Sequence, residues 1–562
     1  MPMILSRFGV VRLLVFSLSA TASFAGALDA RHWQLFIDDF AVACSTGLDR
    51  IVHHPKPRGV VIANDRPWES KGVAPYYVGR KDDGTFFCIY DAIYWVPDPE
   101  GKIVRNGRVQ RDRAQQYVEE IAYATSKDGI HWEKPELGLI EGPTGIDWKV
   151  FPPFPSPTGS DKRNNLGVPF MLADLGGFGN VTDPAKRYAV WSGGQAYFSP
   201  TVPDFIGDPQ WRSKLTPTGG TFSTREHVLH FWDDAAAEWV ALVQNTTPRW
   251  LPSRVIARFA SKDLKTWRSD VALQPDSLDS HEPNDYEEPM FLTPFYTEGV
   301  VLGTLGWLHT DRTTPDGGPV MAASGGPAKV WPWPTNDAYP FAWPWSRKGP
   351  NDMRITISRD GGRTWDRVSS REAWIPHGRE EDSYDRLVLK APSPPVRVGD
   401  EDWFYVGVWD GDHLTTRADA AQSTYYHDRL CRGQIALYTQ KRNRYVSLRA
   451  RTQVETLITK PFVLQGDRIQ LNVDASRGRV RVAVAEYKPV LTLKDSTLST
   501  DPHLLEQNAL PGFGRDDCTP VRTNHIEHTV EFKGGTLDAW RGREVVLFIE
   551  LHDANLYGFR TR

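Results

Sequence analysis

Cysteine, long apolar runs and clustered positive charge are all scarce in this sequence. Its 562 residues hold four cysteines and no CxxC pair, which excludes a disulfide scaffold and a zinc-ribbon type of site. One disulfide stays open in an oxidising compartment, with no pairing favoured. No apolar run reaches the roughly 20 residues that cross a bilayer, so no membrane partner is expected. The formal net charge of -4 and the absence of a basic cluster argue against a nucleic-acid partner.

The first segment has the pattern of an export signal. Arg7 and Arg12 accompany a short apolar stretch at residues 13–22, and Ala25 offers a small residue for cleavage. We interpret residues 1–25 as a signal peptide and expect a secreted or periplasmic protein. An uncleaved anchor is the alternative.

Aromatic and turn-forming residues are abundant. The chain has 21 Trp, 19 Tyr and 25 Phe, together with 46 Gly and 42 Pro. This combination favours short strands joined by tight turns. Aromatic rings on the surface of an exported protein would also offer flat faces to sugar rings, whereas rings in the core would only stabilise the fold.

One motif recurs three times, at residues 126–132, 261–267 and 358–365. Each copy follows a short apolar strand and reads Ser-x-Asp, a turn and then Trp. The Asp is expected to cap the turn of a hairpin, and the Trp to pack back between strands. The copies resemble the Asp-box-like hairpins of propeller glycosidases, where they are structural. Three acids are therefore poor catalytic candidates: Asp128, Asp263 and Asp360.

Further strand patterns lie between these hairpins, and few stretches hold a helical period. Residues 31–440 would supply about five blades of roughly 40–50 residues each. We therefore predict an all-β chain with a five-bladed β-propeller, in which residues 34–37 close the ring and remove an exposed edge.

The pattern changes after residue 440. Apolar and polar residues alternate in several segments separated by turn signals, which predicts a β-sandwich over residues 441–562. We expect this domain to support the propeller or to bind glycan, because it holds no catalytic cluster. The alternating segments are 468–475, 479–487, 528–532 and 545–551.

The order of propeller and sandwich resembles glycoside hydrolase families 32 and 43, and more closely a bacterial group called glycosyl hydrolase family 32-like. The resemblance implies a glycosidase acting on a poly- or oligosaccharide, often at a furanosidic bond, through carboxylate chemistry in the propeller funnel. The motifs that carry it are residues 35–39 (LFIDD), 66–69 (RPWE), 126–138 (SKDGIHWEKPELG), 164–165 (NN), 286–289 (YEEP) and 406–413 (VGVWDGDH).

Glycoside hydrolysis needs a protonated and an ionised carboxyl group on either side of the scissile bond. The sequence Tyr286-Glu287-Glu288-Pro289 is similar to the Glu-x-Pro setting of the family acid, which makes Glu287 the expected general acid. Side chains alternate along a strand, so only one of the two glutamates can point into the funnel. The alternative is a charged strand end that meets solvent.

The other two acids depart from the family pattern. The Asn-Asp-Pro-Asn motif of the family 32 nucleophile is absent, and we place Glu69 in its role, with Asp65 and Asp91 as alternatives. The Arg-Asp-Pro motif of the middle acid is also absent. We place Asp174 there, with Asp183 as the alternative, although Asp183 lies in a turn-like sequence.

Substrate contacts are expected from two groups of residues. The strands that end at His309 and at His413 are expected to reach the funnel, where side chains of blades four and five would bind hydroxyls. These side chains are Trp307, His309, Asp385, Asp410, Asp412 and His413. No cofactor is expected, and a central metal held by His and Asp is the alternative. A proline-rich segment at 331–351 would present a stiff wall of indole rings to a sugar, namely Trp331, Trp333, Trp343 and Trp345.

Two rival functions remain open at this stage. A polysaccharide lyase would use a His or Tyr as base against an acidic sugar, and four histidines are available for it. A propeller without its acids would bind glycan and not turn it over. The oligomeric state is left open. The four histidines are His281, His309, His377 and His413.

Overall fold

In the computed structural model the described part of the chain is built almost entirely of strands. It also holds short 3-10 helices, η3 (Pro184–Lys186), η5 (Arg515–Asp517) and η6 (Asp538–Trp540). None of its helices has the length and apolarity that crossing a bilayer requires. The described residues are 28–66, 69, 72–97, 104–105, 108–109, 115–135, 140–141, 147–148, 171–177, 179–192, 195–202, 204, 214–221, 229–246, 254–282, 285–310, 350–379, 383–391, 393–410, 433–487 and 508–562.

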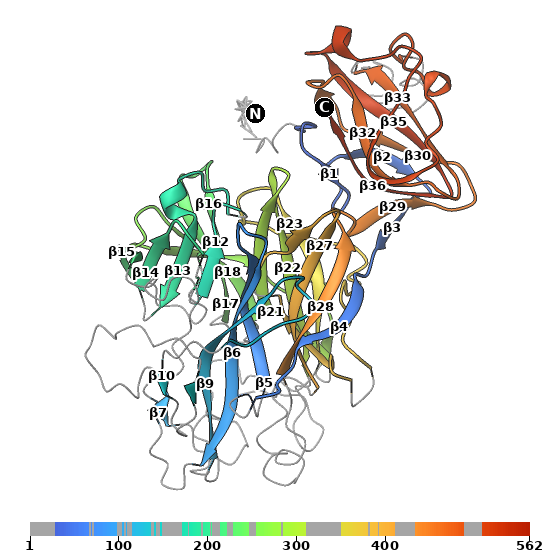
Figure 1. Cartoon of the computed structure of the whole chain (residues 1–562). Helices are drawn as coiled ribbons and strands as arrows, with labels where there is room; N and C mark the ends of the chain where they lie inside the picture. The colour runs from blue at the N-terminus through green and yellow to red at the C-terminus, as the bar shows by residue number, and fades with distance from the viewer. Residues whose placement is uncertain are drawn as a thin grey trace, which may run out of the picture.

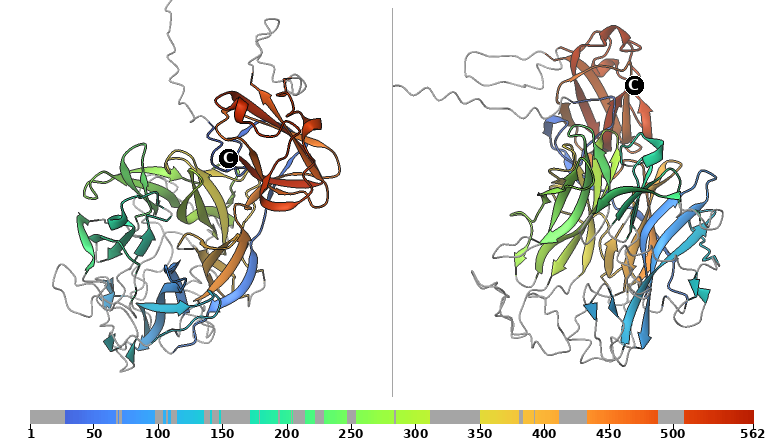
Figure 2. Two further views of the ribbon diagram at one scale, coloured as in Figure 1. Left: turned by 45° about the horizontal axis from the view of Figure 1, so that its top comes forward. Right: turned by 90° about the vertical axis from the view of Figure 1, so that its left-hand side faces the viewer.

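Five blades of antiparallel strands form a propeller in the described chain (Figures 1 and 2). Two small hairpins lie beside them, β7 (Val104–Arg105) with β8 (Arg108–Val109) and β10 (Ile140–Glu141) with β11 (Asp147–Trp148). The prediction of an all-β chain with a five-bladed propeller followed by a sandwich is thereby confirmed. In chain order the blades are: one, β5 (Gly72–Arg80), β6 (Phe86–Pro97) and β9 (Gln115–Ser126); two, β12 (Met171–Asp174), β13 (Tyr188–Ser192), β14 (Gln195–Ser199) and β15 (Thr216–Thr221); three, β16 (Phe231–Asp233), β17 (Glu238–Thr246), β18 (Arg254–Ser261) and β19 (Arg268–Leu273); four, β20 (His281–Glu282), β21 (Asp285–Thr297), β22 (Val300–Thr310), β23 (Asn351–Ser358) and β24 (Asp366–Arg367); five, β25 (Leu387–Lys390), β26 (Val396–Val398), β27 (Glu401–Trp409) and β28 (Gly433–Lys441).

The ring is closed by β4 (Lys56–Ile62), which pairs with β28 and gives blade five its outer strand. The prediction that residues 34–37 close the ring is wrong, because β1 (Gln34–Leu35) pairs with the last strand of the sandwich instead. An apolar strand pattern does not specify its partner. Blades five and one also meet at a parallel contact between Gly433 and Gly72. A Cβ on Gly72 would lie 2.3 Å from the Gly433 nitrogen, so this joint requires glycine.

The three repeated motifs form the same hairpin turn, as the sequence predicts. In each copy the Asp carboxylate accepts backbone N–H groups from residues just after it, at 2.8–3.0 Å. The Trp indole N–H then donates back to a carbonyl in the turn, from Trp132 to Gly129, Trp267 to Leu264 and Trp365 to Gly362. The acids Asp128, Asp263 and Asp360 are therefore structural.

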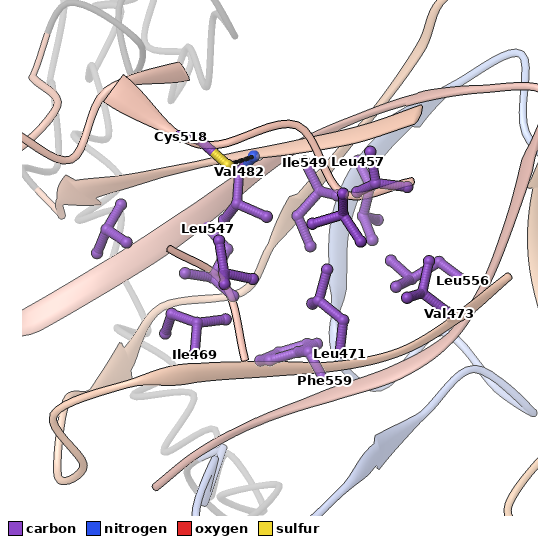
Figure 3. Packing of buried hydrophobic residues seen from close by; sticks show 14 of the residues in the cluster. Leu457, Ile469, Leu471, Val473, Val482, Cys518, Leu547, Ile549, Leu556 and Phe559 are labelled. Carbon is purple, nitrogen blue, oxygen red and sulfur yellow. Dashed lines mark hydrogen bonds between the residues drawn. The ribbon is translucent and has the colours of Figure 1, made fainter. Parts of the chain in front are cut away.

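The sandwich takes strands from both halves of the sequence. Its core packs Leu471, Val473 and Phe559 of one sheet against Val482 and Leu547 of the other (Figure 3). The first sheet contains β3 (Asp49–Val52), β29 (Val446–Ala450), β36 (Ala554–Thr561), β32 (Ile469–Asp474) and β34 (Asn524–Thr529), with β1 on β36; the second contains β2 (Val42–Thr46), β30 (Glu455–Thr459), β35 (Glu544–His552), β31 (Phe462–Val463) and β33 (Arg479–Glu486).

The two ends of the propeller differ. The Asp-capped turns lie at the end next to the sandwich, where Arg359, the neighbour of Asp360, pairs with Asp38 at 2.7 Å. We call this the sandwich end. Strands β6, β22 and β27 finish at the other end, which we call the distal end (Figure 1). Glu287 and His309 lie at the distal end, because β21 begins and β22 finishes there.

Candidate active site

Glu287 lies near the start of β21, the long strand of blade four, directly opposite His309 on β22. Its Oε1 accepts a hydrogen bond from Arg354 Nη2 at 2.6 Å, and its Oε2 accepts the Ser280 N–H at 2.7 Å. The side chain keeps 12% of its surface exposed. Glu287 is thus held by two hydrogen bonds and still reaches solvent.

His309 is held by three carboxylates. Its Nε2 donates to Asp352 at 2.9 Å, and its Nδ1 lies 3.3 Å from Asp285 and 3.7 Å from Glu287. The imidazole is 22% exposed, and Asp285 is the most exposed member of the group at 56%. The ring of His377 lies 6.3 Å away, centroid to centroid. The cluster therefore combines a buried anchor, Asp352, with an open side at Asp285.

The charges around His309 set its protonation. Burial alone would lower its pKa, but the hydrogen bonds to Asp285 and Asp352 and the charge of Glu287 raise the pKa to about 9. The same hydrogen bond from His309 holds the pKa of Asp285 below its usual range. At neutral pH His309 is therefore an imidazolium, and Asp285 beside it is ionised.

A line of arginines supports the cluster from outside. Arg354 on β23 also contacts Asp352 at 3.3 Å and Asp279 at 3.8 Å, while Arg367 on β24 holds Asp279 through both carboxylate oxygens at 2.7 Å. The two guanidinium groups lie over the ring of Trp307, at 4.9 and 4.4 Å from its centroid. These contacts connect strands β22, β23 and β24 of blade four with the loop before β20, which contains Asp279.

Trp307 does not contact substrate as the sequence suggested. Its side chain has 0% exposure and belongs to the core that blades three and four share. Because successive residues of a strand alternate in direction, Trp307 and His309 share a face, but Trp307 lies deeper under the two arginines. Its role is therefore to support the arginines.

Glu288 turns away from this cluster, as strand alternation predicts. It is fully buried, accepts the Arg254 N–H at 2.9 Å and lies 3.4 Å from Arg254 Nε on β18. Of the two adjacent glutamates, only Glu287 joins the histidine cluster.

Glu69 does not take the position of a catalytic carboxylate. It is 0% exposed and accepts hydrogen bonds from Lys134 at 2.6 Å and from the Tyr90 hydroxyl at 2.8 Å. Burial raises its pKa, against the charge of Lys134. A carboxylate closed in this way cannot reach a substrate, and its contacts tie the closing segment to blade one. The alternatives differ from it: Asp65 is exposed and pairs with Lys134, and Asp91 accepts a hydrogen bond from Tyr76.

Asp174 lies at the wrong end of the propeller for a site shared with Glu287. It finishes β12, accepts the Gly177 N–H at 2.7 Å, and approaches Arg187, which also approaches Asp82 in the turn after β5. Asp82 follows β5, whereas Glu69 precedes it, and the nine residues of β5 span roughly 25 Å between these two ends. That length exceeds the 5–9.5 Å or so between paired carboxyl groups of glycosidases. Its alternative Asp183 caps the short helix η3, the turn role its sequence suggested.

The other expected contacts are placed only in part. Asp385 accepts hydrogen bonds from the hydroxyls of Ser383 and Tyr438, and its backbone carbonyl bonds Gly378, next to His377. It lies in the loop whose His377 flanks His309 and has no direct bond to the cluster. Six predicted residues lie outside the described chain: Asp412, His413, Trp331, Trp333, Trp343 and Trp345.

Three members of the cluster, Asp285, Asp352 and Arg354, were not predicted as site residues. Asp352 and Arg354 follow Glu287 by more than 60 positions and reach it only through strand pairing. A signal was present, because both are charged residues inside the buried strand β23. Among the described residues, no group of His, Cys, Asp and Glu is arranged to hold a metal ion.

No family model matches this sequence, and no curated protein is similar enough in sequence to match. The solved structures that are similar to this chain have low sequence identity to it and low TM-scores. A glycoside hydrolase gives a TM-score of 0.36 at 12% identity, over 69% of this chain and 92% of its own. A structure of the GH130 family of mannoside phosphorylases, which contains glycoside hydrolases that target β-1,2 mannosidic linkages in Candida mannan, gives 0.33 at 13%, over 70% and 94%. A family 117 glycoside hydrolase from the marine bacterium Zobellia galactanivorans gives 0.30 at 12%, over 70% and 90%. The fold assignment rests on the sheet topology of this chain itself.

Proposed function

We propose that this protein is an exported glycosidase that cleaves a poly- or oligosaccharide at the distal end of its propeller. The observation that carries the proposal is the protonated imidazole of His309, whose Nδ1 faces Asp285 and Glu287 at the start of the long strand of blade four and whose Nε2 faces Asp352. Breaking a glycosidic bond requires a proton for the leaving oxygen, and His309 holds one near solvent at neutral pH.

In our proposal His309 supplies that proton, a role that the sequence predicted for Glu287. Both oxygens of Glu287 accept hydrogen bonds, from Arg354 and from the Ser280 N–H, and Glu287 lies beside the imidazole at 3.7 Å from Nδ1. Asp285 is the exposed and ionised carboxylate, suited to activate an attacking water. Asp285 lies on the same side of the imidazole as Glu287, at 3.3 Å from His309 Nδ1.

The protonation of His309 disfavours the lyase alternative. A lyase needs a neutral base to remove a proton from the sugar ring, whereas a histidine with a pKa near 9 is mostly charged at pH 7. A reaction that begins with proton donation fits this group better.

The test is a screen of the purified protein against neutral and acidic polysaccharides from plants, algae and bacteria. Release of reducing ends is measured with and without inorganic phosphate, because phosphate can replace water as the attacking group. We expect turnover in the wild type and a loss of about 100-fold or more in both Glu287→Gln and His309→Gln.

Glu298→Gln is the matched control, because Glu298 lies in the turn at the opposite end of the same β21–β22 hairpin. It should keep wild-type activity. Turnover that survives in Glu287→Gln and His309→Gln would contradict the assignment of the site. A product with the ultraviolet absorbance of an unsaturated uronate would indicate a lyase, and binding without turnover would indicate a glycan-binding propeller.

A further inference from the structure

The cluster around His309 is held together by a residue that does not itself face solvent. Arg354 is only 6% exposed, yet its guanidinium contacts both Glu287, through Nη2 at 2.6 Å, and Asp352, through Nε at 3.3 Å. These two carboxylates touch opposite nitrogens of His309. One side chain thus bridges the carboxylates on the two sides of the imidazole.

The orientation of Arg354 is itself fixed from two directions. Its remaining nitrogen lies 3.8 Å from Asp279, which is fully buried and bound by Arg367. Its guanidinium carbon lies 4.9 Å from the centroid of the Trp307 ring, and that of Arg367 lies at 4.4 Å. A planar group that is anchored by a carboxylate and by an aromatic ring keeps its fork in one orientation.

We propose that Arg354 is the positioning residue of the site: it holds Glu287 and Asp352 in place on either side of His309, with Trp307 as its support. This inference rests on the proposed function for its catalytic meaning, although the positioning is a property of the folded protein. Arg354 acts through its neighbours and does not touch substrate.

The charges that face His309 come from three directions. Asp285 and Glu287 lie on β21, Asp352 and Arg354 on β23, and His377 lies in the loop after β24. Of these groups Arg354 is the permanent cation, and it bonds two of the three carboxylates. A change at Arg354 should therefore reach His309 through the positions of those carboxylates.

Arg354→Lys separates positioning from charge. Lysine keeps the positive charge but cannot bridge two carboxylates with a planar fork. With Glu287 and Asp352 no longer held, we expect the pKa of His309 to fall from about 9 by about one unit or more, toward its ordinary value near 6.5. The pKa is measured by NMR titration with histidine-selective labelling, and the signal is assigned by its absence in His309→Gln.

Arg258→Lys is the matched control. Arg258 is also a buried arginine inside a strand, β18 of blade three, where it bonds Asp233 at 2.7 Å and the Gly361 carbonyl at 2.8 Å. The Arg258→Lys variant should lower the midpoint of thermal unfolding, as Arg354→Lys should, and it should leave the titration of His309 unchanged. An unchanged titration in Arg354→Lys, or an equal shift in Arg258→Lys, would overturn the proposal.

A second variant covers the case in which Arg354→Lys does not fold. Trp307→Phe removes part of the surface under the guanidinium without changing a charge, and the pKa of His309 should again fall. An unchanged titration there overturns the positioning role. For an active enzyme, kcat should fall about tenfold while KM changes less. A shifted titration without any turnover would leave the positioning intact and reject the glycosidase.

Discussion

His309 keeps its proton into the alkaline range because Asp285 and Asp352 accept its two N–H groups. A group whose pKa is raised on folding stabilises the folded state at low pH, and that contribution is complete below its unfolded pKa near 6.5. It is lost as the pH rises through about 9. We therefore expect the free energy of unfolding to fall between pH 6.5 and 10, and His309 should account for up to about 3 kcal/mol of that fall.

Urea unfolding of the wild type and of His309→Gln at pH 6 and pH 10 measures this contribution. The wild type should lose more stability than the variant between the two values. An equal loss in both proteins would mean that His309 is not the group responsible. If the protein is an active glycosidase, its rate should also decline above pH 9, as His309 loses the proton it donates.

At the residue scale, the face of a strand on which a side chain lies could be predicted, but how deeply that side chain is buried could not. The sequence was sufficient to predict that only one of Glu287 and Glu288 would face the site, because alternation is local. It could not reveal that Trp307 lies under two arginines, or that Glu69 is closed in by Lys134 and Tyr90. Those positions depend on partners that are distant in sequence.

Among the elements, the segment between β4 and β5 connects the strand that closes the ring to blade one, and Lys134 contacts this segment at three points. Lys134 Nζ donates to the Ala63 carbonyl at 2.7 Å, to Asp65 at 2.8 Å and to Glu69 at 2.6 Å. Lys134 follows Glu133, whose backbone forms an isolated β-bridge with Thr125 in blade one. The ion pair therefore links the start of the ring to its first blade.

Lys134→Met should destabilise the protein by about 3 kcal/mol, because it leaves the buried carboxylate of Glu69 without its charged partner. Urea unfolding followed by tryptophan fluorescence measures the change. Lys127→Met removes an exposed lysine from the Asp-capped turn of the same blade and should alter stability by less than about 0.5 kcal/mol. Equal effects of the two changes would show that the ion pair with Glu69 does not stabilise the ring.

Elements that depend on contacts between neighbouring residues formed as the sequence predicts. Elements that depend on partners far away in the sequence did not. The Asp-capped turns could be predicted because Asp128 bonds residues only two or three positions away. The closing strand could not be predicted, because β1 and β4 both lie before blade one and either could pair with the last strand of the ring. Only β4 runs directly into β5, whereas β1 pairs with a strand more than 500 residues later.

At the scale of the whole molecule, the sandwich depends on both parts of the sequence. Its two sheets include β1, β2 and β3, which precede the propeller, and the strands from β29 onward, which follow it. A fragment of residues 442–562 would leave β29, β30 and β36 without these partners. We expect that fragment to lack a cooperative thermal transition by circular dichroism.

Joining residues 28–52 to the same fragment through a flexible linker should restore the transition. A fragment of residues 442–562 that melts cooperatively by itself would contradict the prediction. The propeller is not tested by either fragment, so the comparison isolates what the early strands add to the sandwich.

The return of the chain to the sandwich also has a mechanical consequence. A pull on residues 28 and 562 loads the pairing of β1 with β36 first, together with the early strands β2 and β3 on β30 and β29. The propeller lies on the loop of chain that these pairs close. Because the two pulled ends leave the antiparallel β1–β36 pair at the same side, tension would separate this pair one hydrogen bond at a time before it reached the blades. The distal end of the ring would keep its shape until these strands of the sandwich had separated.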